Sequence, residues 1–574
     1  MLLLLLNLWQ PPYKSGGCSF SINIKRKTSE GVPMNKIKIM FFTILSIAMI
    51  FSGCNSSEDN KSSQKNLQEA DSITDKSENS NLNSKNEIYG GYFFQDGTKI
   101  LDFDTRYNNI KEKYPDKKVL IWAVDDPMRY EEDFNEYLAE HNKNYVICFK
   151  EYSFNEQSDR ASNNNGNKTY FEKIQSDLDN NRQIDIITTG SESDDEYSNK
   201  YKYMVFKNWL EPLDDYLKNT DKGKALYELM PEKYWESVKQ NNRIYGFDGS
   251  ISCINASVGY TFNSEICDKL KVDVNKFRGS YADSINRIFE ICKNNKLTFV
   301  PHYLDNISLF YDYDFINNFI YINQNGKAAN IYKNKETLEI FKAFENGFSS
   351  GVIDDYIDSS SKSFGNFIYS TAGSYTRDNV KTNDFFGVPI GEGKSVPGYS
   401  IFPIKFKTIH SAKEGTGICR YSKNKDLAFE AFTDFFENKE LSNTLVYGDN
   451  YEEKNGYVVK KGIFSPESFD NMLLRVPYNG MQSKYMSQNI KKALQISKIS
   501  PYCNFCFKTS TVSKQIYKIN DIICEISREF PSNSNKSAEK YLKELNKKLY
   551  DAGLQDVIDE VNRQLDEFYK QKNK

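Results

Sequence analysis

Short, fully apolar runs alternate with amphipathic stretches in the chain beyond residue 115. The run VLIWAV at 119–124 is short enough for a buried strand. Two more strands are predicted at YVICF (145–149) and IDIITT (184–189), and a helix is predicted between them at YFEKIQSDL (170–178). Strands that alternate with helices pair through right-handed crossovers, so this pattern predicts a parallel sheet covered by helices on both faces.

Amphipathic spacing predicts further helices. Tyr130, Phe134 and Leu138 recur every four residues after the first strand. We expect Asp126 to cap this helix and Pro127 to take its first position, because an aspartate accepts from free first-turn amides and a proline lacks one. Two later helices are predicted from broad apolar stripes, one made of Leu427, Ala428, Ala431, Phe432, Phe435 and Phe436, and one after Gly553 made of Leu554, Val557, Ile558, Val561 and Leu565.

The most apolar segment, FFTILSIAMIFSGC at 41–54, is too short to cross a bilayer, which takes about 20 apolar residues. A basic stretch that begins at Met34 precedes it, and small residues lead to Cys54. This order is typical of a secretory signal. We therefore expect translation to begin at Met34 and residues 1–33 to be a spurious extension.

The signal ends in Phe-Ser-Gly-Cys, which resembles the lipobox of bacterial lipoproteins. This resemblance implies a signal peptide at 34–53 and an acylated Cys54. The alternative is a short buried helix with an incidental cysteine. Residues 54–114 are mostly polar and of low complexity, so they lack the apolar side chains that a core needs and predict a flexible tether.

Composition excludes several classes of protein. A net charge of −3 over 574 residues gives no basic field for nucleic acid. The three histidines, His141, His302 and His410, are far apart in sequence, and Cys503-x-x-Cys506 has no second cysteine pair, so we expect no metal site and no cofactor. The aromatic fraction of 14% would suit a pocket for flat ligand faces, and a compositional bias is the alternative.

Ligands of parallel sheets bind beyond the carboxyl ends of the strands. That rule points to Asp125 and Asp126 after the first predicted strand, and to Gly190 and Ser191 after the third. The paired acids at 194–195 and 354–355 could suggest glycoside hydrolysis, but such doublets are more often solvated surface.

The segments WLEPLDDYL, MPEKYWESVKQNNRIYGF and VGYTFNSEI resemble bacterial extracellular solute-binding proteins of the large, oligosaccharide-binding type, which are substrate-binding lipoproteins of ABC transporters. The segments that begin GTGICRYSKNKDLAFEAF and FKTSTVSKQIYKIN resemble later parts of the same family. The resemblance implies an α/β, periplasmic-binding-protein-like fold with two discontinuous lobes joined by a hinge. We place lobe 1 at 115–250 plus 390–450, lobe 2 at 251–389 plus 451–574, and hinge strands at 251–258, 386–390 and 447–451.

A sugar presents hydroxyl groups at its edge and apolar C–H faces, so its site needs carboxylate or amide groups and aromatic rings. The candidate ligand contacts near predicted strand ends and crossovers are Asp125, Ser191, Trp235, Tyr245, Asp248, Tyr303 and Tyr375. Tyr375 follows FIYSTAGS, which resembles the family's turn before a sugar-stacking aromatic residue. Trp235 lies on a predicted helix, where core packing is an equal alternative.

The predicted function is that of a receptor on the outer face of the bacterial cell membrane, attached by lipid alone. It would act as a monomer without catalytic residues and deliver a carbohydrate, expected to be an oligosaccharide, to the permease subunits of an ABC importer. The alternatives are a secreted carbohydrate-active enzyme, and a lipoprotein with the same fold that serves as an adhesin or sensor partner. A peptide is the alternative ligand, because aromatic clefts also suit peptides.

Overall fold

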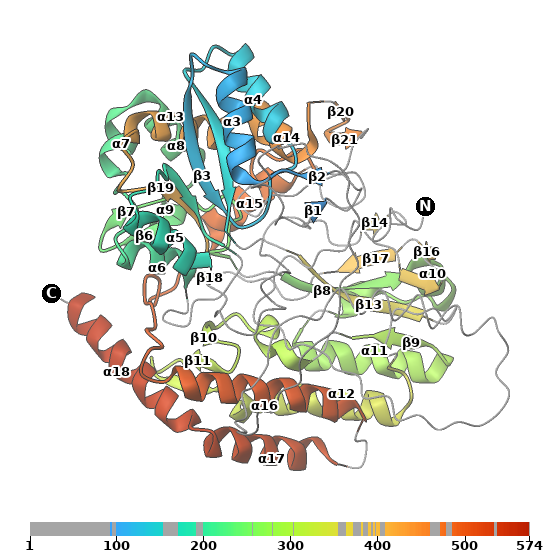
Figure 1. Ribbon diagram of the computed structural model, residues 1–574. Coiled ribbons are helices and arrows are strands. Elements are labelled where there is room, and N and C mark those ends of the chain that lie inside the picture. The colour runs from blue at the N-terminus through green and yellow to red at the C-terminus, as the bar shows by residue number, and fades with distance from the viewer. Residues whose placement is uncertain are drawn as a thin grey trace, which may run out of the picture. The chain divides into compact units, whose positions relative to one another are not determined.

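The computed structural model describes most of the chain beyond residue 98. The described residues are 92–93, 99–152, 170–190, 199–254, 257–277, 279–301, 304–353, 363–370, 380–382, 388–391, 394–396, 398–401, 408–449, 451–459, 471–477, 485–532 and 536–572. Their helices and strands surround two separate hydrophobic cores (Figure 1).

The first core contains a four-stranded sheet in the order β19-β5-β3-β4. The predicted strands β3 (Lys118–Val124), β4 (Tyr145–Glu151) and β5 (Ile186–Thr188) are confirmed and are parallel to one another. β19 (Thr416–Ile418) runs antiparallel to β5, with Thr416 opposite Thr188. The sheet is therefore parallel apart from one edge strand that arrives from far along the chain.

Helices cover both faces of this sheet. α3 (Phe103–Lys113) packs its aromatic side chains against Val119 and Val146 on one face. The other helices around the first core are α4 (Glu131–Glu140), α5 (Tyr170–Asp179), α6 (Lys200–Phe206), α7 (Asp214–Asn219), α8 (Asp221–Leu229), α9 (Glu232–Val238), α13 (Lys425–Glu437), α14 (Lys439–Tyr447) and α15 (Met486–Ile496). The strands β1 (Tyr92–Phe93) with β2 (Lys99–Ile100), and β6 (Lys239–Gln240) with β7 (Arg243–Ile244), form two short antiparallel pairs.

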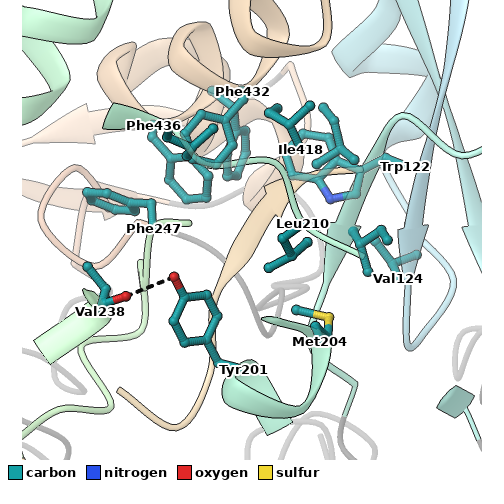
Figure 2. Close-up of a cluster of buried hydrophobic side chains, with 14 of the residues drawn as sticks. Trp122, Val124, Tyr201, Met204, Leu210, Val238, Phe247, Ile418, Phe432 and Phe436 are labelled. Atoms are coloured by element: carbon teal, nitrogen blue, oxygen red, sulfur yellow. Dashed lines mark hydrogen bonds between the residues drawn. The ribbon is translucent and has the colours of Figure 1, made fainter. Parts of the chain in front are cut away.

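Aromatic side chains fill the first core. The ring centroid of Trp122 in β3 lies 5.5 Å from that of Phe149 and 5.4 Å from that of Phe435. Figure 2 shows Phe432 and Phe436 of α13 beside Phe247, whose centroid is 4.7 Å from that of Phe436. The predicted stripe of α13 is thus confirmed as a core face, with Leu427 only partly buried.

The predicted start of α4 is wrong. The helix begins at Glu131 after Tyr130, and Asp126 is exposed in the preceding loop. The helix has no side-chain cap, but the three acidic residues in its first turn interact favourably with the positive end of the helix dipole. Glu131 also accepts a hydrogen bond from the amide of Phe149 at 2.8 Å, which holds the start of the helix against β4.

The second core contains a five-stranded sheet in the order β14-β17-β8-β13-β9. β8 (Ser257–Asn263) is antiparallel to both β13 (Ser363–Ser370) and β17 (Gly398–Ile401), and β9 (Thr298–Val300) is parallel to β13. β14 (Val380–Thr382) pairs with β17 at the edge. A hairpin of β15 (Val388–Gly391) and β16 (Lys394–Val396) contacts this sheet.

Long helices pack around the second core, and α11, α12, α16 and α17 lie below its sheet in the view of Figure 1. The elements are α10 (Ser264–Leu270), α11 (Tyr281–Asn295), α12 (Lys335–Ser349), α16 (Ser513–Ser532), α17 (Ala538–Asp551), α18 (Leu554–Lys572), a three-stranded antiparallel sheet of β10 (Asp314–Asn317), β11 (Ile320–Ile322) and β12 (Ala328–Asn330), and 3-10 turns η1 (Val274–Phe277), η2 (Leu304–Phe310) and η3 (Ile331–Lys333).

The predicted helix after Gly553 is confirmed. α17 ends at Asp551, and Gly553 follows with a φ of +99°, a conformation that glycine adopts without steric cost. α18 then begins at Leu554, and all five residues of its predicted apolar stripe are buried in the second core.

Three chain segments connect the two cores. The first follows Ile254, the second precedes Thr408 and the third precedes Phe507. β18 (Thr408–Ile409) pairs in parallel with β22 (Lys498–Ile499), and Ile254 forms an antiparallel bridge with Ile409. We call these paired segments the hinge. The first predicted hinge strand, 251–258, contains one of the connections.

Two chain segments do not follow the expected lobe boundaries, because each packs with the core of the other lobe. β17 was expected in lobe 1 but pairs with β8 in the second sheet. Met472, Met486 and Leu494 were expected in lobe 2 but pack in the first core. Residues 447 and 451 pack in a small cluster with Val446 and Val458, where β20 (Glu452–Lys454) pairs with β21 (Tyr457–Val459).

Candidate functional site

Polar groups gather at the carboxyl ends of β3 and β5, where β19 begins. Asp125 follows β3 directly and is buried. Because β19 is antiparallel to β5, the residues before Thr416 cross this edge of the sheet. The amide of Thr189 donates to the carbonyl of Gly415 at 3.0 Å, and the amide of Gly415 donates to Oγ1 of Thr189 at 3.1 Å. Residues 413–415 therefore line the edge where the strand-end rule expects a ligand.

The loop 248–252 reaches the same edge. The amides of Phe247 and Thr416 each donate to the other's carbonyl, at 2.8 and 2.9 Å, which places Asp248 just beyond the sheet. Ser250 Oγ donates to Oδ1 of the buried Asp248 at 2.7 Å, and Ser252 Oγ donates to its Oδ2 at 2.8 Å. Two hydroxyl groups thus hold this carboxyl group in position.

Ser252 also joins the loop to residues 413–414. Its Oγ accepts from the amide of Lys413 at 2.9 Å and from the amide of Glu414 at 3.2 Å. With the bond to Asp248, the hydroxyl group uses its single donor and both acceptor positions. Ser250 Oγ lies 3.2 Å from Oε2 of Glu414, so the side chains of Asp248 and Glu414 share a hydroxyl neighbour.

Asp248 and Glu414 thus share the Ser250 hydroxyl at this edge, and Asp125 interacts electrostatically with Glu414. We call Asp125, Asp248 and Glu414 the carboxyl cluster. Burial raises the pKa of Asp248 to about 7, although the hydroxyls of Ser250 and Ser252 oppose that rise. Burial also raises the pKa of Glu414, the negative charge of Asp125 adds to the rise, and Lys200 and Lys413 counteract it. Near neutral pH the carboxyl group of Asp248 is therefore close to its titration point, where it can accept a hydrogen bond when ionised or donate one when protonated.

The backbone of the loop is strained beside this cluster. Ile251 has a φ of +57°, which is rare for a β-branched residue, and its side chain is buried. The amide of Met472 donates to the carbonyl of Gly249 at 3.0 Å and so supports the loop. Such strain persists only where surrounding contacts hold it, and it is common at ligand-binding sites.

Two of the predicted ligand contacts, Asp125 and Asp248, each interact electrostatically with Glu414 at this edge. Tyr245 lies three residues before Asp248, half-buried against the first core, and its amide donates to the hydroxyl of Tyr201 at 3.2 Å. The predicted contact Trp235 packs in the first core, where its side chain is 1% exposed. Its ring stacks on Tyr227, with 4.9 Å between the ring centroids, and its Nε1 donates to the Tyr227 carbonyl, so these contacts are those of a core residue.

Ser191, Tyr303, Tyr375 and the expected lipid-bearing Cys54 lie outside the described residues. The strands that lead to two of them are described. β13 ends at Ser370, which pairs with Ser257 at the start of β8, three residues after Ile254 of the hinge. β9 is parallel to β13, so it too runs toward the hinge side of the sheet before Tyr303.

Sequence reasoning missed Ser250, Ser252, Lys413 and Glu414. Their sequence signal was limited to serines at the start of the first predicted hinge strand and to charged residues just before GTG. Ser250 and Glu414 are 164 residues apart in sequence. They come together because β19 returns antiparallel to β5.

The described residues contain no group of three or more His, Cys, Asp or Glu side chains placed to hold a metal ion. In the same part of the chain, Cys503 and Cys506 are free thiols. The described helices include none that is long and apolar enough to cross a membrane.

Comparisons of sequence found a matching family model and a similar protein. A family model described as a domain of unknown function, DUF3502, matches residues 501–570. A protein of Streptococcus pneumoniae serotype 4 described as a carbohydrate ABC transporter substrate-binding protein is 22% identical over 440 residues, which cover 71% of this chain and 88% of the relative.

Comparisons of structure show a shared fold. The crystal structure of the N-glycan transport solute-binding protein NgtS from Streptococcus pneumoniae covers 79% of this chain and 100% of its own, with 19% identity and a TM-score of 0.56. The same protein in complex with Man1GlcNAc matches over the same shares with 18% identity and a TM-score of 0.50. These comparisons confirm the predicted resemblance and the two-lobed α/β fold of extracellular solute-binding proteins.

Proposed function

We propose that this chain is an extracytoplasmic receptor that binds a carbohydrate, expected to be an oligosaccharide, and delivers it to an ABC importer. The observation that carries the proposal is the carboxyl cluster at the strand ends of a fold shared with a glycan-binding protein. The streptococcal relative described as a carbohydrate ABC transporter substrate-binding protein supports the same conclusion.

The chemistry of the cluster suits a ligand rich in hydroxyl groups. Asp248 and Glu414 can each accept a hydrogen bond when ionised and donate one when protonated. Burial raises the pKa of both groups, and it raises that of Asp248 to about 7. Buried groups of this kind discriminate between ligands, because an analogue that lacks one hydroxyl leaves its partner unpaired. The lysines Lys200 and Lys413 offset part of the negative charge.

The aromatic rings that stack on the sugar would come from the second lobe. Tyr303 and Tyr375 follow β9 and β13, which run toward the hinge side of the second sheet. We assign both residues, and Ser191 after β5, to the ligand-binding surface. A ligand held by the first core and these tyrosines would stabilise the closed arrangement of the lobes by its differential affinity for it.

The remaining features complete the proposed receptor. Cys54 would carry the lipid that anchors the chain to the membrane, and residues 54–114 would be the tether. The permease subunits of the importer would recognise the closed form. The receptor would act as a monomer and would catalyse no reaction.

A thermal-shift screen of the purified protein tests the ligand class. The panel contains monosaccharides, oligosaccharides and peptides. A ligand at 100 times its dissociation constant adds about 2.7 kcal/mol to the free energy of unfolding, so an oligosaccharide should raise the melting temperature by several degrees. A shift with peptides alone would reassign the ligand, conversion of a bound oligosaccharide would identify an enzyme, and no shift across the panel would favour the adhesin alternative.

The same assay tests the tyrosine platform. We expect Tyr375→Ala to weaken oligosaccharide binding by roughly 1 kcal/mol or more while the melting temperature of the free protein stays within a few degrees of wild type. Tyr421→Ala is the matched control, because Tyr421 is 57% exposed and lies at the far end of β19 from the cluster. Equal affinity of Tyr375→Ala and wild type would remove Tyr375 from the site.

A further inference from the structure

The hinge holds three chain segments side by side through backbone hydrogen bonds. The amide of His410 donates to the carbonyl of Cys253 at 2.8 Å, and the amide of Ser500 donates to the carbonyl of Ile409 at 2.8 Å. Ile409 is part of the first core. A group bound to these segments is therefore attached to the first core at the point where the chain passes to the second.

His410 lies on this hinge with a carboxylate near each ring nitrogen. Its Nδ1 is 2.7 Å from Oδ1 of Asp314, and its Nε2 is 3.8 Å from Oδ1 of Asp312. The side chain of His410 is 10% exposed, compared with 30% for Asp312 and 20% for Asp314. The imidazole is thus mostly removed from water and lies between two acidic groups.

The two aspartates belong to a segment of the second core. Asp314 begins β10, and the neighbouring side chains Tyr311, Tyr313 and Phe315 pack in that core. Hinge hydroxyls also contact the acids, because Thr408 Oγ1 donates to Asp312 Oδ2 at 3.1 Å and Ser500 Oγ donates to Asp314 Oδ1 at 2.7 Å. The contact between His410 and residues 312–314 therefore joins the two cores.

This geometry favours the protonated imidazole. A neutral imidazole has one N–H group, whereas the imidazolium has two and can donate toward a carboxylate on each side. Burial alone would lower the pKa of His410, but its interactions with Asp312 and Asp314 outweigh burial and raise the pKa above its ordinary value. The positive charge of Lys413, on the same strand extension, opposes this rise. Asp314 also faces Tyr569 of α18 and Cys503, which are uncharged near neutral pH.

We propose that His410 is a proton-dependent clamp at the hinge, in which the imidazolium holds the acidic segment 312–314 of the second core against β18. Loss of the proton removes one donor and the positive charge, and leaves Asp312 and Asp314 beside a neutral ring. The attachment of the second core to the hinge then weakens. This inference does not depend on what the cleft binds.

The sign of the pH dependence follows from the raised pKa. A histidine whose pKa is higher in the folded chain than in the unfolded chain stabilises the contact fully below the unfolded value, about 6.5. That stabilisation is lost as the pH rises through the folded value. The clamp is therefore closed below about pH 6.5 and is released as the pH rises through the higher pKa of the folded chain.

The experiment measures the histidine and the hinge in the ligand-free protein. The chain has three histidines, so the ring signals of protein labelled with carbon-13 at histidine can be assigned by loss of one signal in His410→Gln. Hydrogen exchange followed by mass spectrometry, corrected for the chemical effect of pH, reports on the amides of His410 and Ser500. His141→Gln is the matched control, because the ring of His141 contacts a backbone carbonyl of its own helix, at 2.9 Å.

We expect His410 to titrate above about 6.5. Exchange at the hinge should accelerate as the pH rises through that pKa in wild type and His141→Gln, but should show no such step in His410→Gln. The acceleration should approach tenfold for each unit by which the pKa exceeds its ordinary value. Titration of His410 at or below about 6.5, or parallel exchange profiles in wild type and His410→Gln, would overturn the clamp.

If His410→Gln does not fold, the variant Asp314→Asn tests the clamp instead. Replacing the nearer carboxylate should lower the pKa of His410 by about one unit, because it removes the partner at 2.7 Å while the amide keeps the shape of the side chain. An unchanged pKa of His410 in Asp314→Asn would contradict the proposed role of the acidic segment.

Discussion

Asp248 illustrates at the residue scale how a position predicted from a strand end acquires its chemistry from tertiary contacts. Sequence reasoning selected Asp125 and Asp248 because they fall near predicted strand ends and crossovers. The hydroxyl groups of Ser250 and Ser252, and the neighbour Glu414, belong to the folded chain and set the behaviour of the carboxyl group. For Trp235 the sequence could not distinguish a ring buried in the core from a ring that stacks on a ligand, and the structure shows a buried ring.

Asp248→Asn tests the pKa of this residue through stability. A carboxyl group whose pKa is raised to about 7 binds its proton more tightly in the folded state. Wild type should therefore lose stability as the pH rises from about 4 to about 7, by up to about 4 kcal/mol from this group. The variant lacks that contribution, so urea unfolding should show a shallower loss over this range.

The exposed Asp221 provides the control for this measurement. Its side chain is fully accessible, so Asp221→Asn should leave the pH dependence of stability within about 0.5 kcal/mol of wild type. An identical pH dependence of unfolding in wild type and Asp248→Asn would show that Asp248 is not buried as an acid.

At the scale of elements, local periodicity predicted β3, β4, β5 and α18, because in each the pattern of apolar residues reflects burial along one element. The start of α4 was predicted wrongly for a related reason. Asp126 and Pro127 have the residue types of a helix start, yet the chain continues as a loop to Tyr130, where Glu131 binds the backbone of β4. The contact that decides this boundary lies 18 residues away in sequence.

Leu565→Ala tests the contribution of α18 to the second core. The side chain is fully buried, so its truncation should lower the free energy of unfolding by about 2–5 kcal/mol. Lys570→Ala on the exposed side of the same helix is the control and should change stability by no more than about 0.5 kcal/mol in urea unfolding. Equal effects of the two substitutions would mean that α18 does not pack as described.

At the scale of the whole molecule, two cores are connected by three segments that meet at the hinge. If the proposed receptor function is right, a ligand that contacts both lobes should favour their closed arrangement. Small-angle X-ray scattering of the purified protein should then show a smaller radius of gyration with a saturating oligosaccharide than without it. A ligand that binds tightly in the thermal-shift assay but leaves the scattering curve unchanged would contradict closure.

The sequence by itself determined the local elements and the class of fold, since alternating strands and helices, apolar stripes and the resemblance of several segments all pointed to two α/β lobes. Only the tertiary structure decided which segments share a core. β17 belongs to the second sheet and Met472 to the first core because strand pairing and packing join residues that no local pattern relates. The same reason explains the site and the hinge, where Glu414 meets Asp248 and His410 meets Asp314 through contacts that span 164 and 96 residues of sequence.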